Sequence, residues 1–137
     1  NIISDQTELA AGDIADADEM LISDGGVLKK VGVDSLATYV RGGAPSGHGD
    51  ATATLSEGVN YASATISADR VWSLPASSGL TPGDRVIVKA AQVDPGVKIT
   101  VTPVGSQTID NGDPVELQED YAAVTLVYVA TDEWRII

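Results

Sequence analysis

The sequence predicts a mainly β protein, in which an antiparallel β-sandwich or barrel domain of the jelly-roll type follows a small N-terminal ββα arm. After residue 50, short apolar runs recur with Gly, Pro, Asn and Asp between them, as in sandwiches and barrels. The stretch "RGGAPSGHGD" (41–50) has the composition of a linker. We therefore expect an N-terminal docking arm over residues 1–41, a Gly-rich linker over 42–50 and a β-sandwich domain over 51–137.

The arm is predicted from "DEMLISDGGVLKKVGVDSLATYV", residues 18–40. Two apolar runs flank the sequence DGG (24–26), which is typical of the connection in a β-hairpin. Asp34 can then cap a helix over "SLATYV", because its carboxylate accepts a hydrogen bond from an exposed N–H, and the glycines at 42–43 would end that helix. Upstream, residues 7–19 favour another short helical turn.

The arm contains too few apolar residues for a core of its own. Chains of roughly 40 residues rarely fold alone without a metal, a disulfide or a partner. The sequence has no cysteine, and the arm lacks the ligands of a zinc site. We therefore expect the arm to dock, either on its own β domain or on another subunit or surface. The residues predicted to form this docking surface are Leu21, Val27, Leu28, Lys29, Lys30, Val31, Leu36 and Tyr39.

Strands of the β domain are predicted over 71–75, 84–93, 97–104, 114–118, 121–130 and 133–137. Alternation gives two inward sets: Val86, Val88 and Ala90 in the second run, and Val97, Ile99 and Val101 in the third. The fifth run is apolar on both faces, so we expect it to be covered on both sides or to meet another chain. Trp72 is expected in the core, and Trp134, Ile136 and Ile137 are expected to be packed.

Acidic residues are frequent in predicted turns and near the N-terminus. The turn residues are Asp84, Asp94, Asp110 and Asp113, which neighbour Gly, Pro or Asn. Asp13, Asp16 and Asp18 are close enough in sequence to suggest a calcium loop, but the spacing D-x-[DN]-x-[DN]-G is absent. We therefore expect no metal site and no cofactor.

The net charge of −12, from 20 acidic and 8 basic residues, restricts the partners. Binding to phosphates needs clustered cations, and Lys29 and Lys30 are the one adjacent pair, so nucleic acid is not an expected partner. No apolar run approaches the roughly 18 residues of a membrane span, so a membrane is not expected either.

An enzyme is not expected. The single histidine, His48, lies in the predicted linker, where a general base would be poorly held. No G-x-S-x-G nucleophile motif occurs. Glu116, Glu119 and Asp120 are close in sequence, as the carboxylates of a glycosidase can be, but acids are so frequent here that their proximity is uninformative.

Two segments resemble virion proteins of tailed bacteriophages. "ADEMLISDGGVLKKVGVDSLATYV" is similar to a segment common in these proteins, and Asp24, Gly25, Lys29, Lys30 and Leu36 carry the likeness. The run "KITVTPVGSQTIDNGDPVELQEDYAAVTLVYVATDEWRII" is similar to β-rich modules of phage fibre and capsid-decoration proteins. The resemblance implies a structural component of the phage particle and a homotrimer.

Two placements on the particle follow from this resemblance. The first is a capsid decoration (cement) protein on the capsid surface, with the major capsid protein or other virion proteins as partners. The second is a tail or head fibre module that binds a host receptor or a carbohydrate, for which Tyr61 is the aromatic residue expected to be exposed. The absence of an internal repeat at a fixed period favours the capsid.

Overall fold

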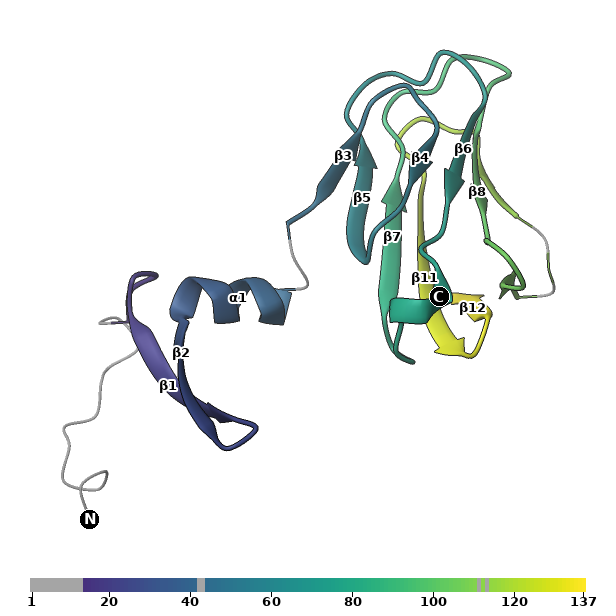
Figure 1. Cartoon of the computed structure of the whole chain (residues 1–137). Coiled ribbons are helices and arrows are strands. Elements are labelled where there is room, and N and C mark those ends of the chain that lie inside the picture. The colour runs from purple at the N-terminus through teal and green to yellow at the C-terminus, as the bar shows by residue number, and fades with distance from the viewer. Residues whose placement is uncertain (1–13, 42–43, 111, 113) are drawn as a thin grey trace. The chain divides into compact units, whose positions relative to one another are not determined.

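The computed structural model describes residues 14–41, 44–110, 112 and 114–137 (Figure 1). The chain divides into two units, Asn1–Gly42 and Gly43–Ile137. The described chain is mainly β, with one α-helix in the first unit and a short 3-10 helix in the second. The prediction of a mainly β protein with a small ββα arm is confirmed at this level.

The first unit contains β1 (Glu19–Asp24), β2 (Val27–Gly32) and α1 (Val33–Arg41). The two strands form the predicted antiparallel hairpin. Its two turn residues, Gly25 and Gly26, have φ of 59° and 81°, values that favour glycine and match the turn type preferred in two-residue hairpins. The local sequence therefore determines this hairpin.

The helix starts one residue earlier than its predicted cap. Asp34 lies in the first turn of α1 instead of before it, and its Oδ1 accepts a hydrogen bond of 2.6 Å from the backbone N–H of Ser35. Upstream, the N–H of Asp18 donates to the carbonyl of Ala15 at 3.0 Å and forms a turn. Residues 14–19 thus lack the predicted helical turn, and residues 7–13 lie outside the described chain.

The second unit contains two sheets. Its elements are β3 (Ser46–His48), β4 (Ala53–Thr54), β5 (Gly58–Ala62), β6 (Arg70–Ser73), η2 (Ser77–Gly79), β7 (Arg85–Lys89), β8 (Ile99–Thr102), β9 (Thr108–Ile109), β10 (Val115–Leu117), β11 (Ala123–Ala130) and β12 (Glu133–Ile136). One sheet has the order β10-β8-β6-β4, and the other has the order β3-β5-β7-β11-β12-β9. All six predicted strand runs contain a strand.

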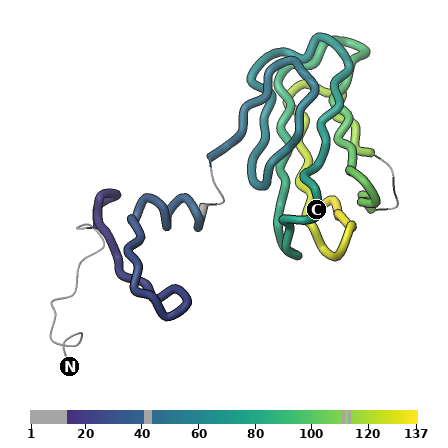
Figure 2. The backbone as a smooth tube through the Cα atoms, viewed as in Figure 1, coloured from purple at the N-terminus to yellow at the C-terminus, as the bar shows by residue number. Residues whose placement is uncertain are grey.

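Consecutive strands from β3 to β11 alternate between the two sheets, a course that the colours of Figure 2 allow the reader to follow. The chain returns to each sheet in the same direction, so β3–β5, β5–β7, β4–β6 and β6–β8 are parallel pairs. Antiparallel pairs join β8 to β10, β7 to β11 and β11 to β12. The predicted antiparallel arrangement is therefore wrong for most pairs, because sheet neighbours here are seldom consecutive strands.

Side chains from both sheets form one buried core. Its residues are Leu55, Ala62, Ile66, Trp72, Leu74, Val86, Val88, Ala90, Val93, Ile99, Val101, Ile109, Leu117, Leu126, Tyr128 and Trp134. Both predicted inward sets are confirmed, with Val97 only half-buried. Trp134 is packed as predicted and meets the ring of Tyr128 edge to face at 5.2 Å between centroids. The core is contained in the second unit.

The predicted packing of the two C-terminal isoleucines is wrong. Ile136 and Ile137 are exposed by 45% and 65%. On the outer side of β11, Val127 is half-buried and Val129 is exposed, and the expectation that this side is covered or meets another chain stays a prediction. β11 thus carries apolar side chains on its outer side as well as in the core.

The second half of the segment predicted as a linker (42–50) forms a strand in the structure. Ser46–His48 forms β3, which pairs in parallel with β5. Gly47 lies beneath the ring of Tyr61, where an added Cβ would be 2.9 Å from the ring carbon Cζ. This glycine therefore serves close packing rather than flexibility.

Candidate docking surface

The first unit exposes most of its apolar side chains. Leu21, Leu28 and Tyr39 are exposed by 69%, 67% and 84%, and in the described arm no residue falls in the buried class. Two other predicted docking residues, Val27 and Leu36, are also exposed, whereas Val31 is half-buried. Contiguous exposed apolar residues on so small a unit are typical of an interaction site.

The hairpin presents two different faces. Strand alternation and the β1–β2 register place Leu21 and Leu28 on one face, which we call the Leu21 face. Met20, Ile22 and Val27 lie on the other, the Met20 face. Both faces are apolar, and the Leu21 face is the more exposed.

Each face also carries one ion pair that closes within the hairpin. Lys29 contacts Asp24 at 2.6 Å on the Met20 face, and Lys30 contacts Glu19 at 2.7 Å on the Leu21 face. The four side chains are all more than half exposed, so each pair adds little stability. The two lysines predicted as docking residues thus already have acidic partners.

The helix α1 also has an apolar side. Val33, Leu36, Ala37 and Val40 have the spacing i, i+3, i+4, i+7 and therefore share one side of α1. The helix contacts β2. On this side Val33 and Ala37 are half-buried, whereas Leu36 and Val40 are exposed by 38% and 75%. The C-terminal end of α1, with Val40 and Tyr39, is thus a second exposed apolar area.

A further apolar surface lies on the outer side of the six-stranded sheet, and it was not predicted as a site. Val59, Ile87 and Thr125 are aligned across β5, β7 and β11, with Val127 in the next row. The outer side of the four-stranded sheet is more polar, since Val71 lies in register with Thr100 and Glu116 there. The signal in the sequence was the double-sided apolar pattern of 121–130.

Two exposed tyrosines flank Lys89 on the same side of the six-stranded sheet. Tyr61 is in register with Lys89 on the neighbouring strand. The Nζ of Lys89 donates to the carbonyl oxygen of Tyr121 and lies 5.9 Å from the centroid of that ring. Tyr61 is exposed as predicted, and Tyr121 was missed because its sequence context resembles that of a strand.

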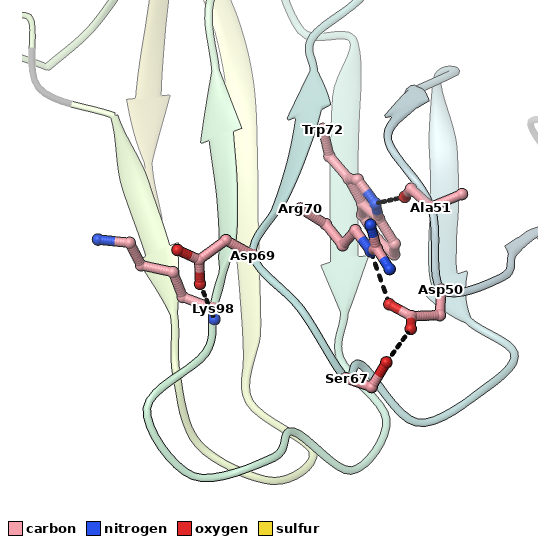
Figure 3. A network of polar contacts seen from close by, with 7 residues as sticks. All are labelled: Asp50, Ala51, Ser67, Asp69, Arg70, Trp72 and Lys98. Atoms are coloured by element: carbon pink, nitrogen blue, oxygen red, sulfur yellow. Dashed lines mark hydrogen bonds and ion pairs between the residues drawn. The ribbon is translucent and has the colours of Figure 1, made fainter.

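Asp50 connects the start of the second unit to β6 (Figure 3). Its carboxylate accepts a hydrogen bond from the Nε of Arg70 at 2.7 Å and another from the hydroxyl of Ser67 at 2.5 Å. The bonds from Arg70 and then from Ser67 hold the pKa of Asp50 far below its ordinary value of 3.8. Asp50 and Arg70 are 20 positions apart, and no local pattern in the sequence links them.

The substitution Asp50→Asn is expected to lower the melting temperature at pH 7. Because the folded-state pKa lies below the unfolded one, the stabilisation is complete above pH 3.8 and is lost as the pH falls towards the folded-state pKa. The difference in melting temperature between the unchanged protein and the variant should therefore shrink as the pH falls to about 2. Circular dichroism melts across this range provide the measurement, and a constant difference would contradict the assignment.

His48 is held more firmly than its sequence context predicted. Its Nε2 lies 3.1 Å from Oδ1 of the buried Asn60, and its ring centroid is 5.0 Å from that of Trp72. The amide nitrogen of Asn60 donates to the carbonyl of Ser56 at 2.7 Å, so its Oδ1 faces the histidine and Nε2 is the donor. The expectation of a poorly held side chain is wrong, and this imidazole anchors β3 to the core.

The acidic residues considered for catalysis lie near a hollow of about 560 Å³ lined by Asp69, Val93, Pro95, Gly96, Val97, Lys98, Gln118, Glu119 and Asp120. Asp120 accepts a 2.8 Å hydrogen bond from the N–H of Val93. Glu116 pairs with Lys98 at 2.6 Å, which lowers the pKa of Glu116 and raises that of Lys98. Two of the carboxylates are therefore already committed to structural contacts.

The described Asp turn residues adopt their predicted roles. The N–H of Asp84 donates to Thr81, the carbonyl of Asp94 accepts from Val97, and Asp110 has φ of 47°. Asp113 lies outside the described chain, as does Asp13 of the calcium candidate.

Among the described residues no group of three His, Cys, Asp or Glu is placed to hold a metal ion. In the same part of the chain, no helix has the length and apolar character needed to cross a membrane.

The sequence was compared with known protein families and with curated proteins. No protein-family model matches the sequence, and no curated protein matches it.

Proposed function

We propose that this chain is a structural protein of a bacteriophage virion, in its simplest form a homotrimeric decoration protein that stabilises the head by binding across capsid subunits. It acts by docking and performs no catalysis. The observation that carries the proposal is the ββα arm, which has a defined hairpin and helix but no buried residue in its described part. The resemblance of the arm to segments of virion proteins supports a role in the phage particle, and the absence of an internal repeat at a fixed period favours the capsid over a fibre.

The β domain contributes the rigid part of such a protein. Its two sheets share one core, and we assign them as the two layers of a β-sandwich. Burial of the exposed apolar side chains across subunit junctions would contribute roughly 25 cal/mol per Å² at each contact. Repetition over the many copies of a symmetric shell would make the seams between capsid subunits harder to open.

Sedimentation with phage capsids stripped of their accessory proteins tests the proposal. The protein is expected to co-sediment at a fixed ratio to capsid subunits and to raise the temperature at which the shells release DNA. Bovine serum albumin at the same concentration controls for trapping in the pellet. Protein that stays in the supernatant with capsids from several tailed phages would contradict the decoration function.

The alternative is a tail or head fibre module that binds a host receptor or a carbohydrate. The specific observation in its favour is the arrangement of Tyr61 and Tyr121 on either side of Lys89, since aromatic rings commonly stack on sugar faces. Binding to bacterial surface polysaccharide that is lost in Tyr61→Ala and Tyr121→Ala would favour this alternative over decoration.

A further inference from the structure

Two cations of the second unit stand apart from its ion pairs. Residues 42–137 contain 12 acids and 5 bases, which gives a net charge of −7. Three of these bases, Arg70, Lys98 and Arg135, contact acidic side chains. Arg85 and Lys89 have no acidic partner among the described residues, and both are exposed on the outer side of β7. Most of this acidic domain repels an anionic ligand, so the outer side of β7 is where such a ligand can be held.

Two tyrosine rings lie beside Lys89. Tyr61 is in register with Lys89 on β5, and its ring rests on the backbone of Gly47, where an added Cβ would be 2.9 Å from the tyrosine hydroxyl oxygen. The ring is thus supported from β3, while 39% of the residue stays exposed. Tyr121 is exposed by 57%, and the centroid of its ring is 5.9 Å from the Nζ of Lys89. A ligand bound to Lys89 therefore meets an aromatic ring on either side.

The backbone of Tyr121 has a conformation that bulky side chains seldom adopt. Its φ is 59°, whereas the other described non-glycine residues with positive φ, Asp110 and Asp132, belong to a type that tolerates the left-handed region better. The N–H of Tyr121 donates a 2.8 Å hydrogen bond to the carbonyl of Ala91, which fixes this conformation. Residues in such conformations are frequent at ligand-binding sites. The turn itself favours glycine, asparagine or aspartate, so a role for the exposed ring accounts for a tyrosine here.

We infer that Lys89 and the rings of Tyr61 and Tyr121 bind an acidic carbohydrate, in which sugar rings bear carboxylates. The ammonium group of Lys89 donates one N–H to the carbonyl of Tyr121 and keeps two for a sugar carboxylate. The tyrosine rings stack on the apolar faces of neighbouring sugars. Arg85, at the other end of β7, provides a second cation for a longer chain. The inference rests on the carbohydrate-binding alternative proposed above and adds the class of carbohydrate.

Isothermal titration calorimetry of the full-length protein with paired ligands tests this site. Oligogalacturonate carries a carboxylate on each ring, and its carboxyl-reduced form keeps the rings but has a primary alcohol in place of each carboxylate. Oligomers of alginate, hyaluronan and polysialic acid, each with its reduced form, vary the linkage. At about 0.15 M salt, which screens distant charges, at least one acidic oligomer should bind about tenfold more tightly than its reduced form. Oligoglutamate should bind as weakly as the reduced forms, because it offers no sugar face.

Substitutions separate the contact to the carboxylate from the contacts to the sugar rings. Lys89→Gln should weaken binding of the acidic oligomer about tenfold and remove its advantage over the reduced form. Tyr61→Ala and Tyr121→Asn should weaken both forms by similar factors, and asparagine suits the left-handed backbone at 121. Lys98→Gln is the matched control, because it makes the same change at a lysine next to the other sheet, and it should bind like the unchanged protein. Circular dichroism melts verify that each variant is folded.

The outcomes distinguish this inference from the proposed functions. Acidic and reduced oligomers that bind equally would overturn the inference and leave a carbohydrate-binding module intact. Oligoglutamate that binds as tightly as the sugar acids, unchanged binding in Lys89→Gln, or no binding of any oligomer would also overturn it. Capsid attachment is scored separately. Protein that binds an acidic oligomer but ignores capsids supports this inference and refutes decoration, whereas protein that attaches to capsids and binds no oligomer does the reverse.

Discussion

Deletion of residues 1–41 is expected to abolish both assembly of the protein and its attachment to capsids, while the remaining β domain stays folded. All residues of the described core lie between Leu55 and Trp134, so the deletion removes no core side chain. It does remove the Leu21 face and the exposed end of α1, which are the surfaces proposed for docking.

The shortened chain can be compared with the full-length protein in three measurements. Its far-UV circular dichroism should show a β-rich protein with a cooperative melt. Its sedimentation coefficient should be that of a monomer, and it should stay in the supernatant when capsids are pelleted. A shortened chain that assembles and attaches as well as the full-length protein would refute the docking role of the arm.

The second large effect is expected from Trp72→Ala, which should destabilise the β domain by about 3–5 kcal/mol. Trp72 is fully buried between the two sheets' side chains, and its Nε1 donates a 2.9 Å hydrogen bond to the carbonyl of Ala51 (Figure 3). Its ring also packs against His48. The substitution leaves a cavity and removes the hydrogen bond to Ala51. Urea unfolding, followed by the fluorescence of the remaining Trp134, measures the loss of stability.

Phenylalanine substitutions give a matched comparison of the two tryptophans. Trp134 is equally buried, but its Nε1 has no hydrogen-bond partner among the described residues. Trp72→Phe loses volume and the hydrogen bond to the Ala51 carbonyl, whereas Trp134→Phe loses volume but also removes an unpaired donor. Trp72→Phe should therefore cost more, and the reverse order would contradict this account of the two sites.

Local patterns in the sequence were sufficient for the elements whose causes are local. The hairpin follows from Gly25 and Gly26, which adopt positive φ at the turn. The inward positions of β7 and β8 follow from strict alternation, as Val86, Val88, Ile99 and Val101 show. The arm's apolar residues were predicted to dock because the unit lacks a core, and their docking stays a prediction.

The sequence by itself thus determined the β character, the arm and the inward faces, since each depends on neighbours within a few residues. Only the tertiary structure decided which strands are paired, because the chain alternates between sheets and brings β5 beside β7 and β6 beside β8. Two further features depend on the tertiary structure. Part of the predicted linker forms β3 by pairing with β5, and Arg70 donates a hydrogen bond to Asp50, 20 positions away in the sequence. Contacts of this kind depend on where distant segments meet in space. The periodicity of a single strand does not identify the strand with which it pairs.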